Sequence, residues 1–170
     1  QTIKTLNEIY KTEKCIVVKT GSDATSLSIR LARSFTGKTK ILRCGYHGWH
    51  DWCVGDKHGI PKYIQKDVID FQFNDLNKLE TLLKKFKDQV AAIIIWPVHT
   101  PLGKRVEFPK KNYLKEIKKL STKYNVVLIF DEIRTGFRMG LNGSQSIYKV
   151  KPNLSVIGKA MGNGYSISAV

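Results

Sequence analysis

The sequence has few cysteines, few acidic residues and no long apolar segment. Its 170 residues include three cysteines and five prolines, and 14 acidic side chains stand against 29 lysines and arginines. No apolar run approaches the roughly 20 residues that a membrane-spanning helix needs, so no membrane interaction is expected. The chain also has no Cys-x-x-Cys pair, internal repeat, low-complexity tract or linker. These absences argue against a disulfide-stapled domain, a zinc ribbon and a repeat protein.

The cysteines and histidines give little support for a metal site. Cys15 and Cys44 lie in or at the end of apolar runs, which predicts reduced core residues and favours a cytoplasmic location. His47 and His50 stand three positions apart, but no third or fourth ligand accompanies them. No metal site is therefore expected.

The basic charge is carried mostly by lysine. The formal net charge is +15, with lysines spread through segments 79–87 and 110–123. Arginines interleaved with aromatic residues, which read and stack on bases, are scarce, so nucleic acid is not the expected partner. A solvated lysine surface accounts better for the charge, and a non-catalytic basic binding module is kept as a distant alternative.

The composition fits one globular domain with a sizeable core, because 42% of the residues are hydrophobic. Gln1 is not an initiator, and segment 166–170 ends the chain inside a strand-like stretch. We therefore expect a piece of a longer protein.

Short apolar runs alternate with segments of helical periodicity. The runs predict strands over 15–18, 41–44, 68–71, 91–95, 126–130 and 154–157. The periodic segments predict a helix after the turn at 20–22 that closes at Gly37, a second helix over 76–86 capped by Asn74 or Asp75, and a third over 109–125. This rhythm predicts an α/β fold with a mostly parallel sheet and helices on both faces.

Ligands of such sheets bind beyond the carboxyl ends of the strands. Four positions fall at that edge: Gly21-Ser22, Tyr46, Asp131 and Lys159. Lys159 follows a buried strand in a glycine-rich turn, where partial desolvation would make its amine a better nucleophile toward carbonyls. The alternative is an ordinary solvated loop lysine.

The other edge positions also allow more than one interpretation. Gly21-Ser22, between a strand and a helix, offers backbone N–H groups to a phosphate, or is a plain helix entry capped by Ser22 or Asp23. No dinucleotide or Walker-type glycine spacing is present. Asp131 could be a metal ligand, a general base or the partner of a protonated heterocyclic nitrogen. Tyr46 could stack on a flat ring.

Five stretches together resemble class III aminotransferases of the fold-type I pyridoxal-phosphate superfamily, closest to the glutamate-1-semialdehyde 2,1-aminomutase group. They are 21–25 (GSDAT), 30–33 (RLAR), 45–52 (GYHGWHDW), 130–138 (FDEIRTGFR) and 158–164 (GKAMGNG). Their order and spacing span nearly the whole chain from residue 14. The resemblance implies that residues 1–170 are part of the cofactor-binding large domain, with an N-terminal segment and a C-terminal small domain absent.

The resemblance also assigns roles around pyridoxal 5′-phosphate. Lys159 would form the Schiff base and shuttle the proton, and Asp131 would keep the pyridine nitrogen protonated. Gly21 and Ser22 would hold the phosphate, while Tyr46 would lie against the ring, and His47 would support that loop. The implied reaction moves an amino group between an amino donor and a carbonyl acceptor, in a full-length homodimer. An aminomutase that shifts the group within one molecule is the nearest alternative.

Three positions depart from the pattern of that family. Asp23 stands where glutamate is usual, one methylene shorter. Trp96 replaces the glutamate of a Glu-Pro pair, which removes a carboxylate close to the site. Arg134 occupies the position near the cofactor's phenolic oxygen, where glutamine or methionine is common. These departures concern the choice of substrate and leave Lys159 and Asp131 in place.

Overall fold

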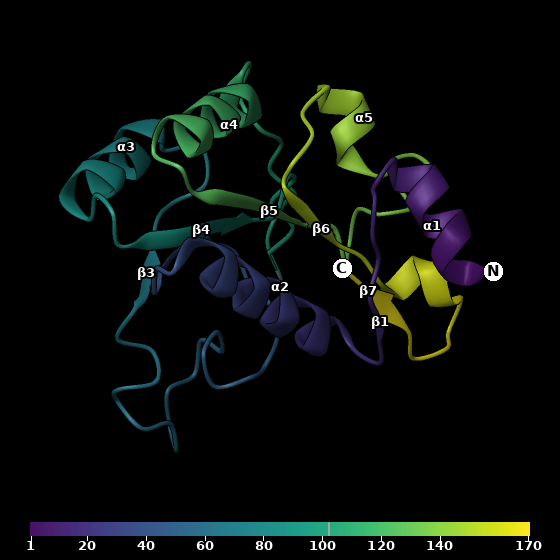
Figure 1. Ribbon diagram of the computed structural model, residues 1–170, viewed down its shortest axis with the longest axis horizontal. Helices are drawn as coiled ribbons and strands as arrows, with labels where there is room; N and C mark the ends of the chain where they lie inside the picture. Colours follow the sequence, from purple (N-terminus) through teal and green to yellow (C-terminus); the bar gives the residue numbers. More distant parts are fainter. Residues whose placement is uncertain (102) are drawn as a thin grey trace.

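A five-stranded parallel sheet forms the centre of the molecule in a computed structural model that describes residues 1–101 and 103–170 (Figure 1). Its strands lie in the order β3-β2-β4-β5-β6. Their bounds are Lys40–Cys44 (β2), Val68–Asp70 (β3), Val90–Ile95 (β4), Val127–Asp131 (β5) and Leu154–Val156 (β6). All four neighbouring pairs are parallel, which confirms the predicted fold class.

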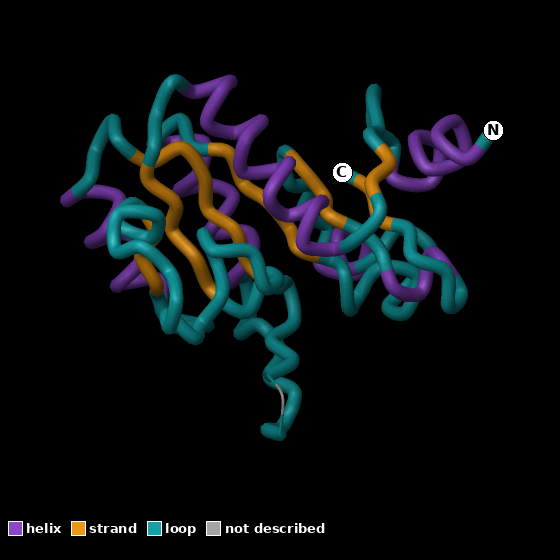
Figure 2. The backbone as a smooth tube through the Cα atoms, turned by 90° about the horizontal axis from the view of Figure 1, so that it is seen from below, coloured by secondary structure: helices purple, strands orange, loops and turns teal. Residues whose placement is uncertain are grey.

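Helices cover both faces of this sheet. Helix α2 (Gly21–Thr36) crosses one face, and α3 (Leu76–Lys85) and α4 (Tyr113–Lys123) lie side by side on the other (Figure 1). Helices α1 (Thr2–Tyr10) and α5 (Ser144–Tyr148) lie beyond β6, near the chain ends. Figure 2 looks onto the α2 side of the sheet, with one helix crossing in front of the strands and other helices behind them.

Strand residues alternate between two apolar cores, as the period of two requires. In β5, Leu128 and Phe130 pack with α3 and α4, whereas Val127 and Ile129 pack toward α2. The same parity directs Asp131, the last residue of β5, to the α2 side. The apolar strand thus delivers a carboxylate to a defined face at the edge of the sheet.

Strand β1 (Val17–Val18) does not join the main sheet. It pairs antiparallel with β7 (Ser168–Ala169) in a separate two-stranded sheet. The prediction of a strand over 15–18 in the parallel array was therefore wrong in its placement, because its partner lies 150 residues along the chain. Cys15 precedes β1 and is only half-buried, so it is not the core residue predicted, whereas Cys44 is 2% exposed.

Two helix boundaries differ from the sequence expectation. Helix α4 begins at Tyr113 rather than near Pro109, because Asn112 adopts a left-handed conformation (φ 64°) that a helix interior excludes. The periodicity over 27–35 belongs to the longer helix α2, which ends before Gly37 as predicted. For α3 the cap is Asp75, whose side chain accepts the Lys78 N–H at 2.8 Å.

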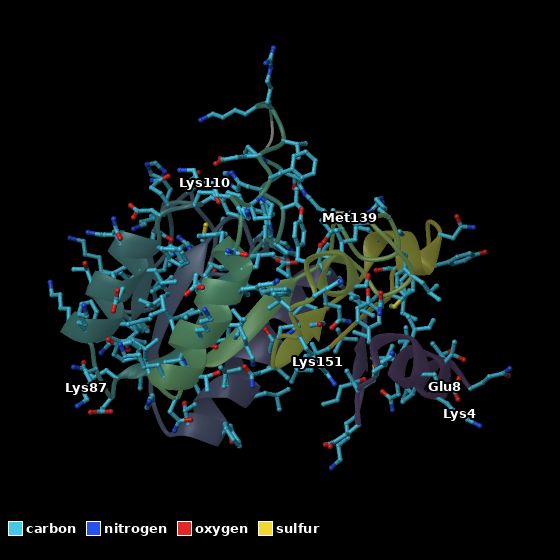
Figure 3. All side chains as sticks on the ribbon, turned by 90° about the horizontal axis from the view of Figure 1, so that it is seen from above. Lys4, Glu8, Lys87, Lys110, Met139 and Lys151 are labelled. Carbon is cyan, nitrogen blue, oxygen red and sulfur yellow. The ribbon has the colours of Figure 1, made fainter. Side chains whose placement is uncertain are left out.

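The lysines occupy the surface. Lys4, Lys87 and Lys110 are exposed, and Figure 3 shows their side chains at the periphery of the molecule. Within the described residues, no helix combines the length and apolarity that crossing a membrane demands.

Candidate functional site

A pocket opens at the carboxyl ends of β4 and β5, against the N-terminus of α2. Its lining includes five of the residues predicted for the site, Gly21, Ser22, Tyr46, His47 and Asp131. It also includes the sixth, Lys159, which follows β6. The structure thus brings together residues up to 138 positions apart (21 to 159), at the edge predicted from the carboxyl ends of the strands.

Asp131 is fixed by two hydrogen bonds inside this pocket. Its Oδ2 lies 2.7 Å from Nδ1 of His47, and its Oδ1 accepts the Ile133 N–H at 3.1 Å. Both side chains are buried, with His47 1% and Asp131 3% exposed. The other ring nitrogen of His47 lies 3.2 Å from the Cys44 carbonyl oxygen, so the imidazole is held at both ends. The carboxylate is therefore pre-oriented at the pocket floor.

The N-terminus of α2 forms another wall. Thr20, rather than Ser22 or Asp23, is the cap: its hydroxyl accepts the Asp23 N–H at 3.1 Å, and Asp23 accepts the Thr20 N–H at 2.9 Å. This capping box leaves the first N–H groups of the helix, at Gly21 and Ser22, facing the pocket without intrahelical acceptors. An anion is favoured there by those donors and by the helix dipole.

The loop after β2 closes over that helix end. Thr25 of α2 donates its hydroxyl to the His47 carbonyl at 2.7 Å, and the Trp49 N–H donates to Ser22 Oγ at 3.3 Å. A Cβ on Gly48 would lie 2.5 Å from Ser22 Oγ, so only glycine allows this approach. The Gly-rich loop that carries Tyr46 and His47 is thus tied to α2 through Thr25, a contact that its sequence does not signal.

Lys159 begins the 3₁₀ helix η1 (Lys159–Gly162) in a left-handed conformation, with φ 45°. Its side chain is exposed, which corrects the prediction of a partly desolvated amine. The neighbouring Gly158 is buried instead, and a Cβ there would lie 2.5 Å from Ser168 Oγ and 2.9 Å from Ile133 Cδ1. The close approach at Gly158 positions Lys159 on the pocket lining, while η1 itself stays at the surface.

The aromatic residues of the loop after β2 lie at the pocket mouth. Tyr46 is 48% and Trp49 69% exposed. Both line the pocket, so each presents an apolar face to whatever enters it. Stacking of Tyr46 on a planar ring remains a prediction.

A second wall contains Trp96 and Arg134, two of the three departures noted in the sequence. Trp96 is buried and lies edge-on to His47, with ring centroids 6.1 Å apart. The guanidinium of Arg134 lies over the Trp96 ring, with Cζ 4.9 Å from its centroid. Sequence reasoning placed both near the site but did not foresee that they contact each other.

Titratable groups close to the site form no metal centre among residues 1–101 and 103–170, where no three His, Cys, Asp or Glu side chains converge. Glu132, next to Asp131, points away into a buried cluster. It accepts hydrogen bonds from the Thr135 hydroxyl, from the Ser144 N–H at 2.8 Å and from the Ser144 hydroxyl at 3.0 Å. Burial raises the pKa of the Glu132 carboxyl above its usual range, opposed by these hydrogen bonds. Its role is therefore to fix the turn that follows β5.

Known proteins align with nearly the whole length of this chain. The chain is 51% identical over 169 residues to the 3-aminobutyryl-CoA aminotransferase of Cloacimonas acidaminovorans, covering 99% of this chain and 41% of that protein. It is 39% identical to the glutamate-1-semialdehyde 2,1-aminomutase of Sulfurisphaera tokodaii, covering 98% of this chain and 42% of that protein.

The fold is shared with a solved relative. The FumI protein of Sphingopyxis sp. MTA144, solved in its PLP internal aldimine form, superposes with a TM-score of 0.91 at 29% identity, over 98% of this chain and 42% of that one. The chain thus spans about two fifths of the length of the proteins it matches. The sequence pattern of the aminotransferase class-III family matches residues 1–170. The chain belongs to the aminotransferase class-III family.

Proposed function

We propose that this chain is the cofactor-binding part of a pyridoxal-phosphate-dependent aminotransferase. The observation that carries the proposal is the convergence of a buried carboxylate, a helix N-terminus and a lysine amine on one pocket, from Asp131, the first turn of α2 and Lys159. A flat pyridine ring with a phosphate group and an aldehyde matches these three groups: the carboxylate suits the ring nitrogen, the helix N-terminus the phosphate, and the amine the aldehyde. When bound, the cofactor supplies an electron sink for carbanionic charge at the substrate's α-carbon.

The residues present fit that group. Asp131, oriented by His47 and by the Ile133 N–H, would accept a hydrogen bond from a protonated ring nitrogen and keep its proton there. The Gly21 and Ser22 N–H groups would bind the phosphate, and the aromatic face of Tyr46 would cover the ring. The Lys159 amine would hold the aldehyde carbon and move the substrate proton. Family membership and the PLP named for the FumI structure support this assignment.

The substrates we propose are an amino donor and a carbonyl acceptor. Relatedness favours a 3-aminoacyl thioester as the first donor to test, because the 51% identical relative is named for 3-aminobutyryl-CoA and is aligned over 99% of this chain. A partner subunit in a homodimer would complete the pocket, whose mouth is open at Tyr46 and Lys159.

The second candidate is an aminomutase, favoured by the 39% identity to the Sulfurisphaera tokodaii enzyme. Its use of the cofactor is the same, so the site geometry does not separate the two. A ¹⁵N-labelled amino donor incubated with an unlabelled keto acid does: label in the second molecule identifies a transaminase, and label confined to the isomerised donor identifies a mutase.

The test of the cofactor proposal is borohydride reduction of the full-length protein with pyridoxal phosphate, followed by peptide mass mapping. We expect a reduced adduct on Lys159 in the wild type and none in Lys159→Ala. Lys115→Ala, an exposed lysine of α4, is the matched control and should keep the adduct. Wild-type protein without an adduct on Lys159 overturns the proposal and brings forward the basic binding module, whose nucleic-acid binding would weaken steeply with salt.

A further inference from the structure

Arg134 is held rigidly at the wall of the pocket. It lies three residues after Asp131, and its side chain is half-buried. Its Nη1 donates to the Thr100 carbonyl and lies 3.4 Å from the Thr100 hydroxyl. The guanidinium plane is supported by the buried Trp96 ring, 4.9 Å away. An arginine fixed by stacking and by hydrogen bonds loses little entropy when it binds a further group.

The charge on this wall has no acidic partner. Within the described residues, neither Arg134 nor Lys159 lies within 4.0 Å of a carboxylate oxygen. The one pocket carboxylate, Asp131, is already paired with His47. A guanidinium has five N–H donors, and in the described part of the chain only Nη1 of Arg134 has an acceptor. Donors are therefore left to bind a ligand oxygen.

Neither Arg43 nor Arg138 lines this pocket. Arg43 forms a two-pronged ion pair with Asp70, with N–O distances of 2.6 and 2.9 Å, and also donates to the Cys53 carbonyl. Arg138 is exposed and donates to the Arg134 carbonyl at 3.1 Å. Arg134 thus combines a place on the pocket lining with donors that have no protein acceptor in the described structure.

We infer that Arg134 is a specificity-determining residue that binds an anionic oxygen of the molecule held in the pocket. The inference rests on the proposed function and deepens it. The oxygen is that of a substrate carboxylate; contact with the cofactor phenolate, which the family resemblance already implies for this position, is the competing outcome of the test. The planar guanidinium binds the carboxylate through charge-assisted hydrogen bonds while Trp96 and Thr100 hold its orientation.

The experiment compares Arg134→Gln and Arg134→Lys with wild type in the full-length, cofactor-loaded protein. Arg30→Gln, an exposed arginine on α2, is the matched control. Two quantities are measured from the absorbance of the bound cofactor: the dissociation constant of a dicarboxylate probe, maleate, and the pH midpoint of the cofactor's own transition. Borohydride trapping at Lys159 is repeated for every variant.

If the oxygen belongs to a substrate carboxylate, Arg134→Gln weakens maleate binding by about tenfold or more, Arg134→Lys restores part of it, and Arg30→Gln leaves it unchanged. If the oxygen is the cofactor phenolate, Arg134→Gln raises the pH midpoint by about one unit, because the ionised oxygen loses its cation. The first result supports the inference. The second assigns Arg134 to the cofactor contact that the family resemblance already implies and overturns the inference, as does a maleate affinity that matches the Arg30→Gln control.

Failure of the proposed function gives a different result. In that case the wild type itself forms no adduct on Lys159. A trapped adduct in all variants, together with unchanged maleate binding and an unchanged midpoint, rejects the role of Arg134 alone. Trp96→Leu, which removes the platform under the guanidinium, should reproduce part of the Arg134→Gln effect if the orientation of the arginine matters.

Discussion

At the scale of single residues, Glu132 and Tyr10 form a buried polar cluster behind the pocket. Tyr10 is 4% exposed and packs edge-on against Phe137, with ring centroids 5.8 Å apart. Its hydroxyl has no hydrogen-bond partner among the described residues. Burial, and secondarily the nearby Glu132 carboxylate, raise the pKa of the Tyr10 hydroxyl, so it stays protonated at all ordinary pH values.

The substitution Tyr10→Phe should therefore stabilise the protein. It removes a buried donor without an acceptor, which should raise the free energy of unfolding by about 1 kcal/mol, and it keeps the aromatic packing. The measurement is the melting temperature of the full-length protein, with Tyr63→Phe as the control because Tyr63 is 70% exposed. A lower melting temperature for Tyr10→Phe would show that the hydroxyl is hydrogen-bonded in solution.

Burial of Glu132 predicts that the stability of the protein depends on pH with a sign opposite to that expected for most carboxylates. Burial raises its pKa in the folded state, so its favourable contribution is present below the usual carboxyl pKa and is lost as pH rises through the raised value. Glu132→Gln cannot ionise and escapes that loss. The melting temperature of Glu132→Gln relative to wild type should therefore increase as pH rises above the usual carboxyl pKa.

The control for this series is Glu8→Gln on α1, an exposed position labelled in Figure 3. Its melting temperature should track the wild type across the same range. A difference between Glu132→Gln and wild type that does not change with pH would contradict the raised pKa. The absolute melting temperature of Glu132→Gln does not test the pKa, because an amide cannot accept hydrogen bonds from all the donors around Glu132.

At the scale of elements, helix α2 links the fold to the pocket. The capping box between Thr20 and Asp23 fixes its first turn, and these hydrogen bonds lower the pKa of Asp23. The contribution of Asp23 is therefore present at neutral pH and lost as pH falls through the lowered value. The aspartate that departs from the family pattern reaches the Thr20 N–H despite its shorter side chain.

Thr20→Ala should destabilise the protein by about 1 kcal/mol and weaken cofactor binding, because the cap that orders the anion-binding N–H groups is lost. Thr20→Ser keeps the hydroxyl and should restore both properties. The measurements are melting temperature and the cofactor dissociation constant from absorbance titration. Unchanged cofactor affinity in Thr20→Ala would show that the Thr20 cap does not contribute to cofactor binding.

The sequence was sufficient for elements defined by their own residues. Five of the six predicted strands lie in the main sheet within one or two residues of their predicted bounds, because each contains a short apolar run, and β4 and β5 are buried throughout. Features that depend on distant partners could not be predicted. The pairing of β1 with β7 and the hydrogen bond between His47 and Asp131, 84 positions apart, leave no local pattern.

The functional site shows the same division between features set by local sequence and features set by distant contacts. The edge position of Asp131 and Lys159 came from strand ends and turn glycines, which are local signals. The exposure of Lys159 did not, because it depends on what covers η1, and the stacking of Arg134 on Trp96 depends on a contact between two loops. Family resemblance supplied roles for these residues, and those roles remain predictions until the experiments above are done.

At the scale of the whole molecule, the pocket is a junction between segments that are far apart in sequence. Asp131 ends β5, Ser22 lies in the first turn of α2 and Lys159 begins η1. A cofactor that contacts all three would tie β5 and α2 to the C-terminal segment. Binding to the native state alone would then stabilise the whole domain rather than one loop.

Pyridoxal phosphate should accordingly raise the melting temperature of the full-length protein, by an amount equivalent to about 2.7 kcal/mol at 100 times its dissociation constant. Inorganic phosphate, which can occupy only the anion site at the α2 N-terminus, should bind more weakly and give a smaller shift at equal concentration. Asp131→Asn should move the cofactor response to higher concentration, because the amide cannot stabilise a protonated ring nitrogen as a carboxylate does. Asp88→Asn is the matched control, since Asp88 is exposed with φ 63°, a conformation that asparagine tolerates. Equal responses of Asp131→Asn and Asp88→Asn would mean that the buried carboxylate serves the fold through His47 and does not reach the ligand.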